Sequence, residues 1–279
     1  MKRLFLTLFI LFCIAKPVVA SPLETLYGAV SGDSAVVPII MYHALEDTPD
    51  NRWEITEAEF EADLRHLLLL DYTPVVMQNL IDFVHYGKAL PQKPIVLSFD
   101  DGRQPALNIL LHLLEKYNTC ITMAIIGSQT DKYTNLASEG HERNFPHMTW
   151  DDVENAIKSG RIEIGCHSYD LHGSIGVGKK RVESEIDYRT RFLADLQQFA
   201  EVFYQHTLLS ANSFTYPLGI FSDLSDEIIK SAGYLASLTC REIPNTIIVG
   251  DHDSLFQLGR YNRPPHIDSA TFFKNIGID

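Results

Sequence analysis

Short apolar runs, many of them β-branched, alternate along the chain with longer segments in which apolar residues recur every three or four positions. A continuous apolar run of this kind is typical of a strand buried on both faces, and the longer period is typical of a helix with one buried side. The predicted strands are residues 37–41, 72–76, 94–99, 120–126, 162–165, 213–216, 235–238 and 258–261. The predicted helices are residues 56–70, 78–86, 105–117, 151–158, 179–204, 223–232 and 269–275.

This alternation predicts an α/β fold. Continuous apolar strands joined by crossover helices form a parallel sheet that is covered on both faces. Thr56 followed by Glu59, and Thr149 followed by Asp152, have the spacing of helix N-terminal caps, and Gly160 falls where a helix should end. Seven or eight such units without a linker rich in Pro, Ser or Gly favour one barrel-like domain, in which functional side chains gather at the carboxyl ends of the strands.

The N-terminal segment does not fit the pattern of strands and helices. A basic start, an apolar run over residues 4–15 and a small-x-small pattern at residues 18–20 have the form of a secretory signal peptide cleaved before Ser21. An uncleaved membrane anchor is the alternative, although the run is shorter than the about 20 residues of a spanning helix. We therefore expect no stable membrane span after cleavage and a periplasmic or extracellular mature protein. The expected organisation is a signal peptide at 1–20, a lead-in at 21–36 and a single domain at 37–279.

Composition changes this picture in two respects. The chain of 279 residues has 46% hydrophobic residues, as ordinary globular proteins do, and a formal net charge of −13. Removal of residues 1–20 takes away three basic residues and no acidic one, which gives −16. Such a surface repels phosphate backbones, so nucleic acid is not an expected partner. Cys120, Cys166 and Cys240 form no C-x-x-C pair, and we expect small buried core residues, with one disulfide as the alternative.

Two adjacent carboxylates follow the predicted strand 94–99, in the sequence Asp100-Asp101-Gly102. Neighbouring side chains point in different directions, so one carboxylate could hold a metal ion while the other acts as a base. A turn that caps the next helix is the alternative for the same residues.

A pair of histidines follows the predicted strand 162–165. His167 and His172 are five residues apart, which on a helix would separate them by about 140°. They can share a metal ion only from a loop, and the glycine-containing segment 173–178 makes a loop the natural interpretation. With Asp101 they would form a site of two histidines and one carboxylate with open positions, which suits a catalytic divalent metal. Polar loop residues without a ligand are the alternative.

A third segment, residues 214–219, is an apolar strand broken by Pro217 and Gly219, and alone it would indicate a simple exit turn. In this order, each at a strand end, the three segments resemble the motifs of the polysaccharide deacetylase family, carbohydrate esterase family four. The resemblance is closest to the secreted poly-β-1,6-N-acetylglucosamine N-deacetylases, and it implies a distorted (β/α)7 barrel with 37–279 as the catalytic domain. It extends from about residue 37 to residue 261 and rests on residues 98–102, 148–152, 162–172 and 214–219.

The resemblance implies a role for the charged residues at these strand ends. Asp101, His167 and His172 would be the ligands of one divalent metal ion, with zinc expected and nickel or cobalt as alternatives. Asp100 would be the general base that takes a proton from the attacking water.

It also implies that the third segment lines the substrate groove through Thr215, Pro217 and Gly219, and that the backbone N–H of Tyr216 faces the oxyanion. Many family members have an arginine in place of Thr215, and that arginine steadies the base. The biofilm-polysaccharide branch lacks it too, so what orients Asp100 remains open at the level of sequence.

A general acid must protonate the leaving amine. The family usually supplies a histidine from a Leu-x-His motif near the C-terminus, which this chain lacks. In the biofilm branch the motif order is circularly permuted, and the histidine lies in an early Met-Tyr-His segment that matches residues 41–43. We assign the role to His43, with His266 as the alternative.

Other side chains could serve either the site or the scaffold. Arg52, Asp251 and Arg260 could pair with Asp100, hold substrate hydroxyls or form surface ion pairs. The aromatic residues that could stack on sugars or belong to the core are Trp53, Trp150, Tyr169 and Tyr216.

The resemblance implies a secreted, metal-dependent hydrolase that removes N-acetyl groups from an acetylated polysaccharide. The expected substrate is an N-acetylglucosamine polymer of the biofilm type, and the products are acetate and a glucosamine unit. An O-acetyl esterase acting on xylan, or a peptidoglycan or chitin deacetylase, would use the same site. A non-catalytic glycan-binding module with the same fold is the alternative from a different class.

Overall fold

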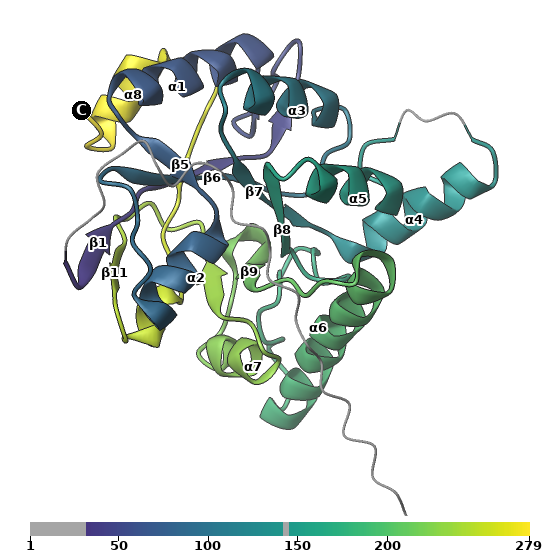
Figure 1. Cartoon of the computed structure of the whole chain (residues 1–279). Coiled ribbons are helices and arrows are strands. Elements are labelled where there is room, and N and C mark those ends of the chain that lie inside the picture. The colour runs from purple at the N-terminus through teal and green to yellow at the C-terminus, as the bar shows by residue number, and fades with distance from the viewer. Residues whose placement is uncertain (1–31, 142–144) are drawn as a thin grey trace, which may run out of the picture.

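The computed structural model describes residues 32–141 and 145–279 (Figure 1). At its centre, eight strands form one curled parallel sheet with the order β10-β9-β8-β7-β6-β2-β12, and β5 pairs with β6. The α/β fold expected from the sequence is confirmed. The strands of this sheet are β2 (Ile39–Tyr42), β5 (Thr73–Val75), β6 (Pro94–Phe99), β7 (Ile121–Ile125), β8 (Ile162–Cys166), β9 (Ser213–Thr215), β10 (Ala236–Leu238) and β12 (Tyr261–Asn262).

Two short strand pairs lie outside this sheet. β1 (Ser34–Val36) runs antiparallel to β11 (Thr246–Ile248), and β3 (Ala44–Leu45) runs parallel to β4 (Glu54–Ile55). The expected signal segment 1–20 lies outside the described residues, whereas the end of the expected lead-in forms β1. Among the described residues, no helix is both long and apolar enough to cross a membrane.

Helices surround the sheet (Figure 1). The predicted capping box of the first helix is present, because the Thr56 side chain accepts from the Glu59 N–H and the Glu59 carboxylate accepts from the Thr56 N–H. The helices are α1 (Glu57–Leu69), α2 (Met77–Tyr86), α3 (Leu107–Lys116), α4 (Gly127–Ser138), α5 (Trp150–Lys158), α6 (Glu185–Thr207), α7 (Ser225–Ser231) and α8 (Ser269–Asn275), with 3-10 turns η2 (Pro217–Gly219) and η3 (His252–Leu255).

The sequence pattern missed one helix and placed the start of another too early. It missed α4, whose first N–H groups donate to the backbone carbonyls of Ser168 and Tyr169 rather than to a capping side chain. The predicted helix 179–204 is wrong at its start, because residues 179–184 lie outside the helix and the Ser184 side chain caps α6.

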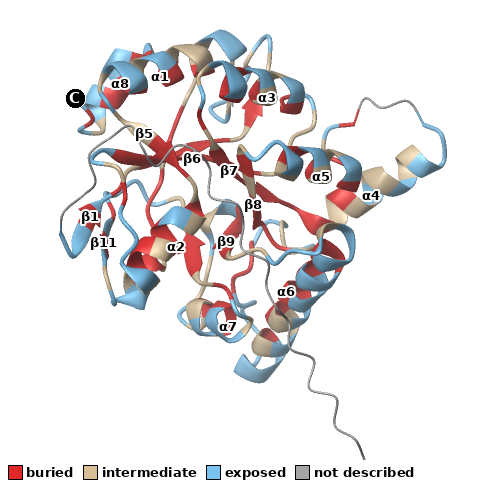
Figure 2. Cartoon of the chain, in the orientation of Figure 1, coloured by how far each residue is buried: buried red, intermediate tan, exposed pale blue. Residues whose placement is uncertain are grey.

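Side chains on the strands alternate between two hydrophobic clusters, which Figure 2 shows as the buried centre of the molecule. In β6, Ile95, Leu97 and Phe99 belong to the cluster that contacts α1, α3, α5 and α6. Val96 belongs to the second cluster, which α2 covers. Ser98 and Asp100 continue the alternation on the side of Val96, so the strand carries Asp100 toward the inside of the curled sheet.

The segment 258–263 joins the two edges of the sheet. At one edge, the Leu258 N–H donates to Ser237 O in β10 at 2.8 Å. At the other, the Arg263 N–H donates to Met41 O in β2 at 3.0 Å. Arg260 therefore lies at the closure of the barrel, and its side chain is completely buried.

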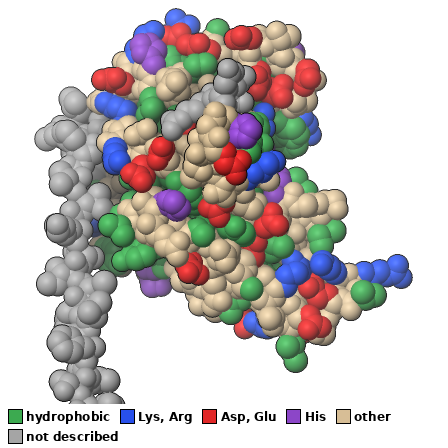
Figure 3. All heavy atoms as spheres, turned by 90° about the vertical axis from the view of Figure 1, so that its right-hand side faces the viewer, with side chains coloured by type: hydrophobic (Ala, Val, Ile, Leu, Met, Phe, Trp, Pro, Cys, Tyr) green, Lys and Arg blue, Asp and Glu red, His purple; other side chains and the backbone are tan. Residues whose placement is uncertain are grey.

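On the side of the molecule that carries α4, α5 and α6, acidic and basic side chains are interspersed (Figure 3). The three cysteines of the described residues are free thiols, with Cys166 buried and Cys120 and Cys240 partly buried. Cys166 therefore agrees with the expectation of a small buried core residue, whereas Cys120 and Cys240 are only partly buried.

Candidate active site and metal centre

The carboxyl ends of β2, β6 and β8 bring five polar side chains together. His43 follows β2, Asp100 and Asp101 follow β6, and His167 and His172 lie in the loop that follows β8, as expected. The Nε2 atom of His43 is 3.9 Å from Asp100 Oδ2, and the Nε2 atom of His172 is 3.3 Å from Asp101 Oδ1. These residues come from three regions of the sequence, and the parallel sheet places them at one edge.

The turn after β6 separates the two neighbouring carboxylates. Asp101 and Gly102 both have left-handed backbone angles, with φ values of 70° and 64°. A non-glycine residue in this region is uncommon and marks a constrained backbone. The turn leaves the Asp100 side chain 2% exposed and the Asp101 side chain 23% exposed. A Cβ atom on Gly102 would lie 2.9 Å from Ile125 Cγ2, so only glycine fits this position.

Three of the side chains have the arrangement of metal ligands. One ligand atom from each of Asp101, His167 and His172 lies within 4.8 Å of the others. The separations are 3.2 Å between the two Nε2 atoms and 3.6 and 3.3 Å from these atoms to Asp101 Oδ1. Ligands held about 2.0–2.1 Å from a tetrahedral ion lie about 3.3 Å from one another.

The surroundings of His167 fix which ring nitrogen faces the cluster. Its Nδ1–H donates to the backbone carbonyl of Thr215 at 2.8 Å, which leaves the lone pair of Nε2 directed toward His172. Two imidazole nitrogens that face each other at 3.2 Å repel unless a cation or a proton lies between them. The residues present therefore fit a divalent metal ion, and Thr215 contributes a carbonyl that orients one ligand.

The pKa values of the ligands reflect their mutual charges. Burial alone would raise the pKa of Asp101, but its hydrogen bond to His172 and the neighbouring histidines lower it strongly. Burial lowers the pKa of His167, which keeps its imidazole neutral near pH 7. Burial opposes protonation of His172 as well, but the hydrogen bond to Asp101 outweighs it and raises the pKa. A carboxylate and neutral imidazoles are the forms that bind a metal, so Asp101 and His167 are already in the binding form and a bound cation would displace the proton that Asp101 favours on His172.

Asp100 is held by Arg260. The NH1 and NH2 groups of Arg260 donate to the two carboxylate oxygens of Asp100 at 2.7 and 2.8 Å. Burial would raise the pKa of Asp100, but the charge of Arg260 and its hydrogen bonds to the carboxylate lower it. Asp100 is thus kept ionised in a fixed orientation.

All five N–H donors of Arg260 have acceptors in the described residues. Besides Asp100, the guanidinium donates to Thr239 O at 2.8 Å, Ser98 Oγ at 3.1 Å and Cys240 Sγ at 3.8 Å. The sequence suggested a surface ion pair as one interpretation of Arg260, and the complete burial of its side chain shows that this interpretation is wrong.

His43 lies beside Asp100, with its Nε2 atom 3.9 Å from Asp100 Oδ2. Burial lowers the pKa of His43, although the nearby carboxylates oppose this effect. Its Nδ1 atom is buried and has no hydrogen-bond partner among the described residues. Trp53 packs against the imidazole with ring centres 4.8 Å apart, and Arg52 lies over the indole at 4.6 Å.

The structure does not bring His266 to Asp100. Its side chain is exposed, and its backbone N–H donates to Glu59 at 2.6 Å. No hydrogen bond or ion pair in the described residues links the two, so geometry favours His43 over His266.

The expected oxyanion donor is wrong. The backbone N–H of Tyr216 is engaged, because it donates to Leu238 O at 2.9 Å and continues the pairing of β9 with β10. Pro217 has no N–H, and those of Gly219 and Ile220 donate to backbone carbonyls within the turn. The Leu218 N–H is the one in this turn with no acceptor in the described residues, and Leu218 has a left-handed φ of 58°.

Three of the four aromatic candidates belong to the scaffold. Trp150 and Tyr216 are buried in the core, and the Tyr169 hydroxyl donates to Asp131 at 2.9 Å. Trp53 is 39% exposed beside His43 and is the one placed to contact a ligand. Asp251 lies at the start of η3, and no interaction links it to Asp100 in the described residues.

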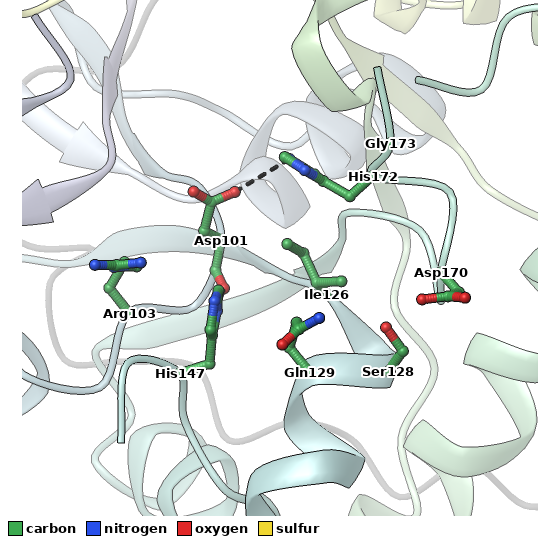
Figure 4. Close-up of a pocket in the computed structure, with 9 residues that line it drawn as sticks. All are labelled: Asp101, Arg103, Ile126, Ser128, Gln129, His147, Asp170, His172 and Gly173. Atoms are coloured by element: carbon green, nitrogen blue, oxygen red, sulfur yellow. Dashed lines mark hydrogen bonds and ion pairs between the residues drawn. The ribbon is translucent and has the colours of Figure 1, made fainter. Parts of the chain in front are cut away.

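A pocket of about 460 Å³ opens beside Asp101 and His172 (Figure 4). Its walls come from the segments that follow β6, β7 and β8, from the start of α4 and from the segment before α5. The other lining residues are Arg103, Ile126, Ser128, Gln129, His147, Asp170 and Gly173. The His147 Nδ1–H donates to the backbone carbonyl of Asp101 at 2.8 Å, so this wall is tied to the metal-ligand turn.

Comparison with known proteins identifies relatives of this chain. The poly-β-1,6-N-acetyl-D-glucosamine N-deacetylase of Escherichia coli K12 is 24% identical over 218 residues, which cover 70% of this chain and 32% of that protein. The chain thus spans about a third of the length of that relative.

Solved structures share the fold. The de-N-acetylase from Aggregatibacter actinomycetemcomitans has a TM-score of 0.71 and 22% identity, over 87% of this chain and all of that one. IcaB from Ammonifex degensii has a TM-score of 0.67 and 22% identity, over 88% of this chain and 96% of that one.

A family model described as polysaccharide deacetylase matches residues 87–237, which is more than half of the chain. The matched stretch contains Asp100, Asp101, His167, His172 and the segment 215–219. His43 and Arg260 lie outside it and reach the site through the closure of the sheet. The chain therefore belongs to the polysaccharide deacetylase family.

Proposed function

We propose that this protein is a metal-dependent N-deacetylase of an N-acetylglucosamine polysaccharide, with the biofilm polymer poly-β-1,6-N-acetylglucosamine as its substrate. The observation that carries the proposal is the position of the Asp100 carboxylate. It lies between Arg260, which holds it, and His43, 3.9 Å away, at the edge of the Asp101, His167 and His172 cluster.

The proposed chemistry assigns one task to each group. Asp101, His167 and His172 would hold a divalent cation, which would supply positive charge to polarise the acetamide carbonyl and acidify water. Asp100 removes the proton from the attacking water. The Leu218 N–H is the candidate donor to the carbonyl oxygen as negative charge develops there.

His43 completes the reaction by protonating the leaving nitrogen. An amine anion is a very poor leaving group, so the carbon–nitrogen bond breaks only when the nitrogen receives a proton. Water adds to the acetyl carbon, and the products are acetate and a free amine on the sugar. Trp53, half-exposed beside His43, offers an apolar face on which a sugar ring can stack.

The choice of polymer rests on the relatives. The E. coli relative carries the poly-β-1,6-N-acetyl-D-glucosamine activity in its name, and 24% identity supports it for this chain without deciding it. The proposal includes secretion, with residues 1–20 removed as a signal peptide and the enzyme working in the periplasm or outside the cell. N-terminal sequencing of the protein recovered from cells tests the cleavage before Ser21.

The experiment that tests the function is acetate release from poly-β-1,6-N-acetylglucosamine oligomers. The mature protein is treated with a chelator, and zinc, nickel or cobalt is then added back in separate samples. We expect no release after chelation and recovery with at least one metal. Release from acetylated xylan, chitin or peptidoglycan but not from the oligomers would show that the proposed substrate is wrong and that the enzyme acts on the other polymer.

The Asp100→Asn variant separates an enzyme from a binding module. We expect this variant to bind one metal ion and glycan but to release no acetate. An Asp223→Asn variant, which changes an exposed carboxylate before α7, serves as the matched control and should keep full activity. Equal acetate release by both variants would show that Asp100 is not the general base.

A further inference from the structure

The pocket beside the metal ligands has opposite charges at its two ends. Arg103 lies on one side, next to Asp101, and Asp170 lies on the other, beyond Ile126 (Figure 4). Arg103 has a counter-charge, Glu46, at 3.9 Å. The Asp170 carboxylate is exposed in the pocket, and no described residue donates a hydrogen bond to it or forms an ion pair with it.

The backbone that carries Asp170 is fixed in place. The N–H groups of Tyr169 and Asp170 donate to the two carboxylate oxygens of Asp195 at 2.8 and 2.7 Å. The Leu171 N–H donates to Ser168 Oγ at 3.1 Å. Because only Leu171 separates Asp170 from the metal ligand His172, this loop holds a free carboxylate at a constant place relative to the reaction centre.

The wall next to Asp170 has unused hydrogen-bonding capacity. The Ser128 hydroxyl lies beside Asp170 (Figure 4); its oxygen is buried and has no hydrogen-bond partner among the described residues. The Gln129 side chain lines the same wall. Hydroxyl and amide groups around one carboxylate match a ligand with several hydroxyls and one positive charge.

We propose that this pocket binds the sugar unit next to the one being deacetylated, and that Asp170 pairs with the ammonium group of that unit once its own acetyl group has been removed. The inference rests on the proposed function and specifies its substrate class as a partly deacetylated, cationic polymer. A neutral acetamide in the same place would leave the carboxylate without a counter-charge. The protein as a whole has a formal net charge of −13, which also attracts a cationic polymer.

The test compares two tetramers of β-1,6-linked N-acetylglucosamine, one fully acetylated and one with a single internal glucosamine. For the wild-type enzyme we expect kcat/KM to be roughly two- to fivefold higher for the second, the range for an exposed ion pair. The Asp170→Asn variant should bring this ratio close to one, and Asp223→Asn should leave it as in the wild type. A ratio measured within one preparation is insensitive to the fraction of folded protein.

Two results would overturn the inference. One is a wild-type ratio of one, and the other is the same ratio in Asp170→Asn as in the wild type. If neither tetramer yields acetate with any metal, the proposed function fails. Calorimetric binding of the glucosamine-containing tetramer then tests whether Asp170 forms a sugar-binding subsite. Weaker binding to Asp170→Asn than to the wild type supports the subsite, and equal binding rejects it.

Discussion

Arg260 and Asp100 are 160 residues apart in the sequence, and their side chains form a two-point ion pair in which both members are almost completely buried. The planar guanidinium fixes both carboxylate oxygens at once, which a single ammonium group cannot do. The position that often carries a base-steadying arginine is Thr215 in this chain. Arg260, which enters from the closure of the barrel, fills the role that sequence comparison left open.

Replacing Arg260 by lysine should therefore impair catalysis more than substrate binding. A lysine keeps the charge but can fix one oxygen at most, so Asp100 is free to rotate away from the attacking water. We expect kcat for acetate release to fall at least about tenfold, with KM and metal content close to the wild-type values. Steady-state kinetics and metal analysis of Arg260→Lys provide the measurement.

A matched control exists in the same fold. Arg263 forms an equally buried pair with Asp63 at 2.8 and 3.1 Å, away from the metal cluster. Arg263→Lys should lower the free energy of unfolding without a comparable loss of kcat per folded molecule. If both lysine variants lose kcat to the same extent, Arg260 acts through general stability and not through Asp100.

The sequence was sufficient to predict the strands and helices that are marked by a pattern of neighbouring residues. The central strands β6 and β7 have largely apolar runs, and alternation within β6 sends Asp100 to the same side as Val96. The motif residues follow strand ends, so their meeting at one edge could be predicted from a parallel sheet alone.

Long-range contacts explain what the sequence did not reveal. Arg260 is a single basic residue whose partners lie in β6 and beside β10, and nothing near it in the sequence marks it as buried. The engagement of the Tyr216 N–H depends on the register between β9 and β10. The start of α4 depends on carbonyls of the loop after β8, about 40 residues later.

Removing the imidazole of His43 should affect amide substrates more than activated esters. His43→Ala deletes the proposed proton donor, and general acid catalysis is worth about 10²–10⁴ in rate. A phenolate leaving group needs no proton, so hydrolysis of 4-nitrophenyl acetate should be far less affected than release from the polysaccharide. The ratio of the two rates is the measurement, and His266→Ala should leave it unchanged. Equal losses on both substrates would argue against the acid role.

Gly102 should tolerate no side chain. Gly102 and Gly160 have nearly the same backbone angle, with φ values of 64° and 69°, but a Cβ atom would meet Ile125 at 2.9 Å in the first case and nothing within 4 Å in the second. Gly160→Ala costs only the strain of the left-handed backbone, about 1–2 kcal/mol. Gly102→Ala adds a steric clash of about 1–3 kcal/mol. Urea unfolding of the two variants gives the difference, and similar losses would mean that the turn after β6 shifts freely.

Glu163 should make the stability of this protein depend on pH. Its carboxylate lies below α2, where Oε2 accepts from the Thr122 hydroxyl at 2.8 Å and Oε1 accepts from the Gln78 N–H at 3.0 Å. Burial raises its pKa from 4.5 to about 7, and the nearby charge of Asp82 adds to the effect. Between these two pH values the folded state keeps a proton that the unfolded state has lost, so a rise in pH favours unfolding.

The Glu163→Gln variant isolates this effect, because glutamine resembles the protonated carboxyl group and does not titrate. We expect the free energy of unfolding of the wild type to fall between pH 5 and pH 7.5 by more than that of the variant. Asp195, whose pKa burial raises to about 6, contributes in the same direction to both proteins and cancels in the comparison. Parallel stability profiles for the two proteins would show that Glu163 ionises in the folded state as easily as in the unfolded chain.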